Sequence, residues 1–265
     1  MDFTGKVALV TGGGGGIGRA TALGFALRGA KVMVVDADAD SGQASVDIIA
    51  QRGGTSAFVC ADVTKSALVR DYVDRTVAAY GRIDAFFNNA GIEGKVMPTQ
   101  DYDEEVFDRV IAVNLKGVFL GLRYVLPVMI SQGSGAVVNT ASVAGLFGGP
   151  GMPAYVASKH GVLGLTKVAS TDVAGLGVRV NAVCPGPVET RMMRSLESQR
   201  NPNDPEAVHA AYAASTPSGR YALPEEVAGA VLYLCSDLSG DVTGTHIVVD
   251  GGRAASGGAT AAKRK

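Results

Sequence analysis

The chain has 265 residues, of which 47% are hydrophobic and 18% charged, and its formal net charge is −1. This composition is typical of a large globular unit with a sizeable core, and the interspersed charges exclude a basic surface for nucleic acid. Three scattered cysteines predict no disulfide framework and no metal site, which favours a reducing, cytoplasmic compartment. Because residues 118–130 carry Arg123 and Pro127, no uncharged apolar run is long enough to predict a membrane span.

Short apolar runs alternate along the chain with longer segments of helical periodicity. The predicted strands are 6–11, 31–36, 56–60, 83–87, 135–140, 178–183 and 245–249. The predicted helices are 17–28, 40–52, 65–80, 101–113, 115–131, 153–174 and 224–235. Because the strands are apolar on both faces, the pattern predicts an α/β fold, a doubly wound Rossmann-type domain. Its seven-stranded parallel sheet would have helices on both faces and functional groups at the carboxyl ends of its strands.

No linker divides the chain, so residues 1–252 are predicted to form a single domain. Residues 187–220 are polar and irregular, and we expect them to form a substrate lid that contains short helices. Residues 253–265 are rich in Ala and Gly and basic, and they are expected to form a loose C-terminal tail.

A glycine-rich run at 11–18 lies between the first predicted strand and the first helix. Glycines there let the backbone approach a pyrophosphate at the positive end of a helix. Two patterns match the run: G-x-G-x-x-G through Gly13, Gly15 and Gly18, and T-G-x-x-x-G-x-G through Gly12, Gly16 and Gly18. Spacing alone does not choose between them.

Asp36 ends the second predicted strand, where a carboxylate is expected to hold the hydroxyls of an adenosine ribose. A 2′-phosphate at the same place would meet a like charge. No base stands at Gly15 or Ala37 to compensate, and Arg19 is the only nearby candidate. The sequence therefore predicts NAD rather than NADP.

Tyr155 and Lys159 are four residues apart, which places both side chains on one face of the predicted helix. An ammonium roughly 4 Å from the phenol would favour the phenolate by roughly 4 kcal/mol at an effective dielectric constant of about 20. That interaction would lower the pKa of the phenol from about 10 toward neutrality and make Tyr155 a general acid/base. Taken alone, the pair is more typical of an ordinary helix with a half-buried tyrosine and a solvated lysine, so the functional interpretation depends on the motifs that accompany it.

Together these motifs are similar to those of the short-chain dehydrogenase/reductases, which the chain resembles over essentially its whole length. The motifs are Thr11-Gly12-x-x-x-Gly16-Ile17-Gly18, Asp62-Val63, Asn88-Asn89-Ala90-Gly91, Asn114, Ser142, Tyr155-x-x-x-Lys159 and Pro185-Gly186. The resemblance favours Gly12, Gly16 and Gly18 as the working glycine pattern.

The resemblance implies a catalytic tetrad of Asn114, Ser142, Tyr155 and Lys159. Ser142 would donate a hydrogen bond to the substrate oxygen, and Tyr155 would transfer the proton. Lys159 would hold the nicotinamide ribose and depress the pKa of Tyr155, and Asn114 would anchor a proton relay through water. A helix cap is the alternative for Asn114, and a loop serine is the alternative for Ser142.

The cofactor site follows from the same resemblance. Asp62 and Val63 would border the adenine, and Val188 and Thr190 would contact the carboxamide. Asn89, Ala90 and Gly91 would line the path of the cofactor. The remaining cofactor-binding residues expected are Gly12, Gly15, Gly16, Ile17, Gly18, Asp36, Tyr155, Lys159, Pro185 and Gly186.

The resemblance implies an NAD-dependent oxidoreductase that interconverts a secondary alcohol and a ketone. Residues 89–95 and the expected lid are similar to those of members that act on cyclic ketones and alcohols, and Met192 and Met193 favour an apolar substrate. The alternatives are a steroid, sugar or 3-hydroxyacyl dehydrogenase, or a non-catalytic dinucleotide-binding protein. We expect a small-molecule substrate, a homotetramer as in many family members, and neither nucleic acid nor a membrane as a partner.

Overall fold

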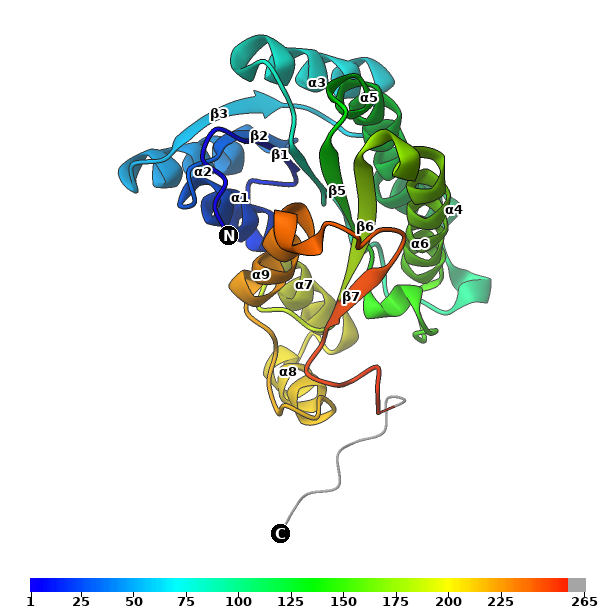
Figure 1. Ribbon diagram of the computed structural model, residues 1–265. Helices are drawn as coiled ribbons and strands as arrows, with labels where there is room; N and C mark the ends of the chain where they lie inside the picture. Colours follow the sequence, from blue (N-terminus) through cyan, green and yellow to red (C-terminus); the bar gives the residue numbers. More distant parts are fainter. Residues whose placement is uncertain (257–265) are drawn as a thin grey trace.

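The computed structural model describes residues 1–256 and is built around one parallel sheet with the strand order β3-β2-β1-β4-β5-β6-β7 (Figure 1). The strands are β1 (Val7–Thr11), β2 (Lys31–Asp36), β3 (Thr55–Cys60), β4 (Ala85–Asn88), β5 (Gly135–Thr140), β6 (Val178–Pro185) and β7 (His246–Val249). The predicted α/β class and its seven parallel strands are confirmed. The strand order reverses between β1 and β4, and a crevice for a ligand is expected at their carboxyl ends.

Helices cover both faces of the sheet (Figure 1). They are α1 (Gly16–Ala26), α2 (Ala39–Gln51), α3 (Ser66–Tyr80), α4 (Glu104–Ile111), α5 (Gly117–Gln132), α6 (Pro153–Val173), α7 (Arg191–Arg200), α8 (Pro205–Ala214) and α9 (Pro224–Cys235). Side chains of α1, α2 and α9 pack on one face of the sheet, and those of α3, α5 and α6 pack on the other.

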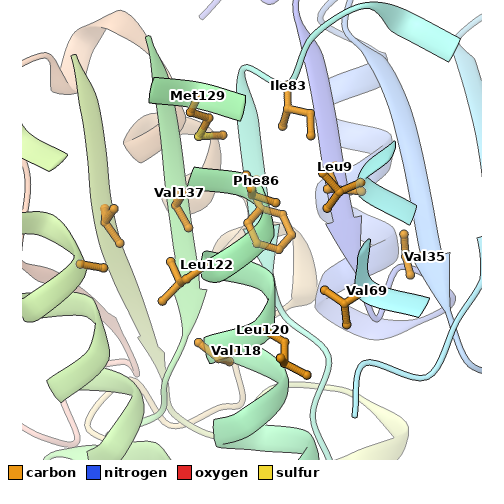
Figure 2. Packing of buried hydrophobic residues seen from close by; sticks show 14 of the residues in the cluster. Leu9, Val35, Val69, Ile83, Phe86, Val118, Leu120, Leu122, Met129 and Val137 are labelled. Carbon is orange, nitrogen blue, oxygen red and sulfur yellow. The ribbon is translucent and has the colours of Figure 1, made fainter. Parts of the chain in front are cut away.

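The core consists of one apolar cluster on each face of the sheet. Figure 2 shows part of the first, in which Leu9, Phe86 and Val137 from three strands lie against Val118 and Leu122 of α5. Successive residues of a strand point to opposite faces, so the neighbours of these strand residues enter the second cluster. Burial on both faces explains why the strands read as continuous apolar runs.

The predicted break between helices at residue 114 is wrong, because the helix runs on from Glu104 to Gln132. A π-helical turn, η2 (Ala112–Lys116), joins α4 to α5 and contains Asn114. By length and composition the combined helix is apolar enough to cross a membrane. One side of it packs into the core, where Val118 and Met129 are buried.

The segment 187–220 contains α7 and α8. The C-terminal tail, expected to be loose from residue 253, begins in packed structure. Arg253 donates a hydrogen bond to Ser215 (2.6 Å), and its guanidinium lies 5.3 Å from the centroid of the Tyr212 ring. Residues 257–265 lie outside the described part of the chain.

Candidate active site

The glycine-rich loop joins β1 to α1 in a backbone path that requires glycine at particular positions. Gly12 and Gly16 have positive φ angles of 62° and 47°. A Cβ on Gly18 would lie 2.0 Å from the carbonyl oxygen of Gly12. Gly15 stands at the N-cap of α1 without a side-chain cap, and a Cβ there would meet nothing within 4 Å. The first-turn N–H groups of α1 are thus free of a side-chain cap, which is the arrangement that binds a pyrophosphate.

Asn89, the residue after the neighbouring strand β4, supports this loop. Its side-chain Nδ2 donates to the carbonyl oxygens of Thr11 (3.1 Å) and Gly12 (3.4 Å). The backbone N–H groups of Asn89 and Ala90 donate to Thr11 Oγ1, and Thr140 Oγ1 donates to Asn89 Oδ1. The Asn89 side chain is therefore committed to shaping the loop. Thr11 and Thr140 were not predicted as site residues, although both end strands at the edge where function was expected.

Asp36 lies at the end of β2 beside the glycine loop. Its carboxylate accepts hydrogen bonds from the backbone N–H of Gly14 (2.8 Å) and of Asp38 (3.0 Å). A Cβ on Gly14 would come within 2.7 Å of Asp36 Oδ2, so glycine is needed for this contact. Each oxygen keeps a second lone pair for a ribose hydroxyl. The loop, the α1 terminus and this carboxylate fit a dinucleotide.

Arg19 was the only base near enough to be considered for a 2′-phosphate. Its guanidinium donates to Ser45 Oγ (2.9 Å), to the Ser41 carbonyl oxygen (3.3 Å) and to the Gly14 carbonyl oxygen. These bonds tie α1 to α2 and leave the side chain directed at protein atoms.

Lys159 lies on α6 with only 3% of its surface exposed. Its Nζ donates to the carbonyl oxygen of Thr140 at the end of β5 (2.7 Å) and lies 5.6 Å from the centroid of the Tyr155 ring. A Cβ on Gly91 would lie 3.6 Å from this nitrogen, so the turn after β4 passes directly over it. Burial lowers the pKa of Lys159 from 10.5 to about 8.

Tyr155 begins the same helix, and the structure contradicts the expected depression of its pKa by Lys159. Burial raises the pKa of the phenol above its ordinary value, and hydrogen bonding with Ser142 only partly opposes this. The carboxylate of Glu93 raises the pKa further. The ammonium of Lys159 lies over the ring and bonds to Thr140 rather than to the phenol oxygen. The phenol is therefore protonated at neutral pH, which suits a proton donor.

Ser142 is brought to Tyr155 from the end of β5. Its Oγ accepts the N–H of Ala144 (3.1 Å) and donates to the carbonyl oxygen of Pro185 (3.4 Å). Its side chain thus caps a short 3-10 turn, η3 (Val143–Gly145), and is held in one orientation while remaining close to the phenol. A hydroxyl and a phenol converge here on one point at the carboxyl edge of the sheet.

Asn114 does not cap a helix, because it lies inside the continuous helix in the turn η2. The buried amide accepts the Ile92 N–H (2.8 Å), and its Nδ2 donates to the Ile92 carbonyl oxygen (2.9 Å) and to Ser158 Oγ (3.2 Å). Ser158 in turn donates to the Tyr155 carbonyl oxygen (2.7 Å). Asn114 thereby connects the turn after β4 to the helix that carries Tyr155 and Lys159.

Most of the other expected cofactor residues lie at the same edge of the sheet. Pro185 ends β6, and a Cβ on Gly186 would lie 2.7 Å from the Asp250 side chain. Thr190 caps α7, and its methyl group lies against Gly16. Asp62 and Val63 follow β3, and Asp62 accepts the Thr64 N–H (2.9 Å).

Two of the expected residues direct their side chains into the protein. Val188 is 3% exposed and belongs to the core, and Ile17 packs against the same cluster. The backbone of Val188 is therefore what remains to face a cofactor, whereas Ile17 is only partly buried.

Comparisons with known proteins agree with this geometry. A family model described as enoyl-(acyl carrier protein) reductase matches residues 12–254. Levodione reductase of Leifsonia aquatica is 43% identical over 255 residues, which cover 96% of each chain. Cyclohexanol dehydrogenase of Acinetobacter sp. (strain SE19) is 41% identical over 249 residues, covering 94% of this chain and 95% of the relative.

Solved structures give the same result. The crystal structure of levodione reductase superposes with a TM-score of 0.94, covering 96% of this chain and 99% of the other at 43% identity. That of NAD⁺-bound xylitol dehydrogenase gives a TM-score of 0.91, covering 95% and 100% at 37% identity. The chain belongs to the short-chain dehydrogenase/reductase family. It is an oxidoreductase of the class that uses NAD(P), and the resemblance seen in its sequence motifs is confirmed.

Proposed function

We propose that this protein is an NAD-dependent dehydrogenase that interconverts a compact cyclic secondary alcohol and its ketone. The observation that carries the proposal is the convergence of Ser142, Tyr155 and Lys159 at the carboxyl edge of the sheet, beside a loop that fits a dinucleotide. The intact Asn114, Ser142, Tyr155 and Lys159 set argues against a non-catalytic dinucleotide-binding protein.

The residues divide the work between the substrate oxygen and the cofactor. A bound nicotinamide cofactor would supply the hydride for reduction of the carbonyl carbon and would accept it during oxidation. Ser142 donates a hydrogen bond to the substrate oxygen, where negative charge develops during reduction. Tyr155 donates its phenolic proton to that oxygen and recovers it during oxidation. Lys159 binds the nicotinamide ribose, and Asn114 positions the proton path to Tyr155.

The preference for NAD rests on Asp36 and Arg19. The Asp36 carboxylate can accept two ribose hydroxyls and repels a 2′-phosphate, while Arg19 is bonded to three protein oxygens. A relative of 37% identity has been crystallised with NAD⁺, which is consistent with this choice.

A cyclic substrate is supported by the names of two relatives of about 40% identity, levodione reductase and cyclohexanol dehydrogenase. Met192 and Met193 are half-buried on α7 and offer apolar surface beside the site. An acyl-thioester substrate is the second candidate, favoured by the description of the matching family model. Asp36 argues against it, since acyl-carrier reductases of the family generally prefer NADP. Steroids and sugars are the remaining alternatives.

We also propose that residues 1–252 act as one domain with a substrate lid at 187–220, and that the protein is a cytoplasmic homotetramer. Large apolar side chains are exposed on α5 and α6, among them Phe119 (44%), Ile130 (37%) and Val168 (60%), and Leu238 (70%) is exposed in the turn after α9. Such surfaces are typical of subunit contacts. The free cysteines suit a reducing compartment.

The function is tested by incubating the protein with NAD⁺ or NADP⁺ and a panel of secondary alcohols, and following reduced nicotinamide by its absorbance. The panel contains cyclohexanol, a cyclic diol, a steroid alcohol, a sugar alcohol and a 3-hydroxyacyl thioester. We expect the highest kcat/KM with cyclohexanol-type substrates and NAD⁺. Preference for the thioester with NADP⁺ would replace the proposal by the second candidate.

A further inference from the structure

Gln199, near the end of α7, joins the expected lid to the loop that follows β4. Its Oε1 accepts the backbone N–H of Val96 (2.9 Å), and its Nε2 donates to the carbonyl oxygen of Gly94 (3.2 Å). The side-chain amide thus pairs with two backbone groups as a neighbouring strand would. We call this pair of bonds the Gln199 latch.

The two ends of α7 are attached to opposite sides of the site. At its start, Thr190 lies against Gly16 of the nucleotide loop. At its end, the Gln199 latch reaches Gly94 and Val96, a few residues beyond the Gly91 turn over Lys159. The helix has 10 residues and therefore spans about 15 Å, so it extends across the site from the cofactor side to the substrate side.

A third loop joins the same contact. Met97 donates its backbone N–H to the carbonyl oxygen of Gly151 (2.8 Å), and Arg200 donates to the carbonyl oxygen of Pro150 (3.4 Å). The loops after β4 and β5 and the end of α7 therefore meet at one place. Two of these segments lead directly to the site, because Gly91 lies over Lys159 and the loop that contains Pro150 and Gly151 connects Ser142 to the helix of Tyr155.

The lid itself is held together from inside by Glu197, whose side chain is fully buried. Its carboxylate accepts the phenol of Tyr221 (2.7 Å) and pairs with His209 (3.0 Å) and Arg194 (3.1 Å). These partners come from α7, from α8 and from the segment after α8. The two helices are thereby coupled, so a movement of α7 carries α8 with it.

The Gln199 side chain, by contrast, lies at the exposed surface. Hydrogen bonds that water can replace are individually weak, so the latch opens and closes readily. We propose that Gln199 is a specificity-determining residue, whose latch to Gly94 and Val96 closes over a compact ring. A bulkier substrate keeps the latch open and loses both of its hydrogen bonds.

The test compares cyclohexanol with 4-tert-butylcyclohexanol as substrates of the NAD-dependent oxidation, and therefore rests on the proposed function. In Gln199→Ala, which removes both latch bonds together with a bond to Ser195 Oγ within α7 (3.3 Å), the ratio of kcat/KM for the bulky alcohol to that for cyclohexanol is expected to rise about tenfold. Gln199→Glu keeps the acceptor for Val96 and loses the donor for Gly94, and its ratio should rise by about threefold.

Ser198→Ala is the matched control, because Ser198 Oγ bonds only within α7, to the Arg194 carbonyl oxygen (3.0 Å). Its ratio should stay at the wild-type value. An equal loss of kcat/KM for both alcohols in Gln199→Ala would indicate a merely structural role and overturn the proposal, as would an unchanged ratio.

Hydrogen exchange separates this proposal from the proposed function. In Gln199→Ala the backbone amides of 191–200 should exchange faster than in the wild type, whatever the substrate. If exchange is faster in the variant but the protein oxidises none of the alcohols, the proposed function and the proposed limit on substrate size are both refuted. The hydrogen bonds of the latch would still be supported. Unchanged exchange would refute the latch.

Discussion

Replacing Lys159 by methionine is expected to make the protein more stable while abolishing its activity. The ammonium is buried, and the difference between a pKa of 10.5 and one of about 8 corresponds to about 3 kcal/mol against the charged form in the folded state. Methionine has a similar length, suits a helix and carries no charge. Loss of the hydrogen bond to the Thr140 carbonyl oxygen costs about 1 kcal/mol of stability. The variant is therefore expected to be more stable than the wild type by about 2 kcal/mol at pH 7.

The gain in stability of Lys159→Met over the wild type should decrease as the pH rises. Below pH 8, Lys159 is protonated in both the folded and the unfolded chain, so the wild type carries the whole penalty. Between about pH 8 and 10.5 the folded protein has released this proton and the unfolded chain still binds it, so wild-type stability rises with pH. The advantage of Lys159→Met should therefore shrink through this interval, and once the penalty is gone the variant should be less stable than the wild type by the lost hydrogen bond.

Thermal unfolding followed by circular dichroism at pH 7, 8.5 and 10, without added nucleotide, measures the effect. At pH 7 the variant should unfold roughly 4–8 °C above the wild type for a chain of this size. Lys167→Met is the control, since Lys167 lies exposed on the same helix and its replacement should leave the unfolding temperature unchanged. A Lys159→Met variant that unfolds below the wild type at pH 7, or a difference that does not vary with pH, would refute the reasoning.

Three further substitutions test the site. Tyr155→Phe should lower kcat by about 10³-fold with nucleotide affinity unchanged, as measured by turnover and by NADH fluorescence titration, and remaining wild-type turnover would contradict the proton-transfer role. Because the pKa of Tyr155 is raised by burial, wild-type alcohol oxidation should increase, and ketone reduction decrease, toward alkaline pH. Asp36→Ala should reduce the kcat/KM preference for NAD⁺ over NADP⁺ by at least about tenfold, and an unchanged preference would disprove its role in selectivity. Gly18→Ala, whose Cβ would meet the Gly12 carbonyl oxygen, should weaken NADH binding at least about tenfold, whereas Gly229→Ala on an open face of α9 should not; equal affinities would show that the loop tolerates a side chain.

The fold was predictable because its determinants are local. Buried parallel strands such as β1 are apolar throughout, and glycines such as Gly81, with a φ of 82°, end helices where the periodicity stops. The location of Ser142, Tyr155 and Lys159 at one edge followed from the strand order. The hydrogen-bond partners of these three side chains could not be predicted in the same way, because they depend on how loops distant in the sequence meet.

The acceptor of the Lys159 hydrogen bond is an example of a partner that could not be predicted from the sequence. Helical spacing correctly placed the ammonium near Tyr155, but the carbonyl oxygen of Thr140 competes for it and is contributed by a strand. The electrostatic prediction for the phenol therefore had the wrong sign. Glu197 is a second case: in the sequence it is one acid in a polar segment, and only tertiary packing buries it among Tyr221, His209 and Arg194.

The π-helical turn η2 also fixes the rotational phase between the two halves of the helix that contains it. Before the turn, Val106 and Val110 of α4 pack against α6 and the loop after β4; after it, Val118 and Leu122 of α5 pack against the sheet. An i→i+5 turn contains one residue more than an α-helical turn, so the chain accommodates an additional residue here while the core faces of α4 and α5 keep their directions. Asn114 lies in this wide turn, where its side chain bonds to Ile92 and Ser158, so the irregularity of the helix coincides with the residue that connects it to the site.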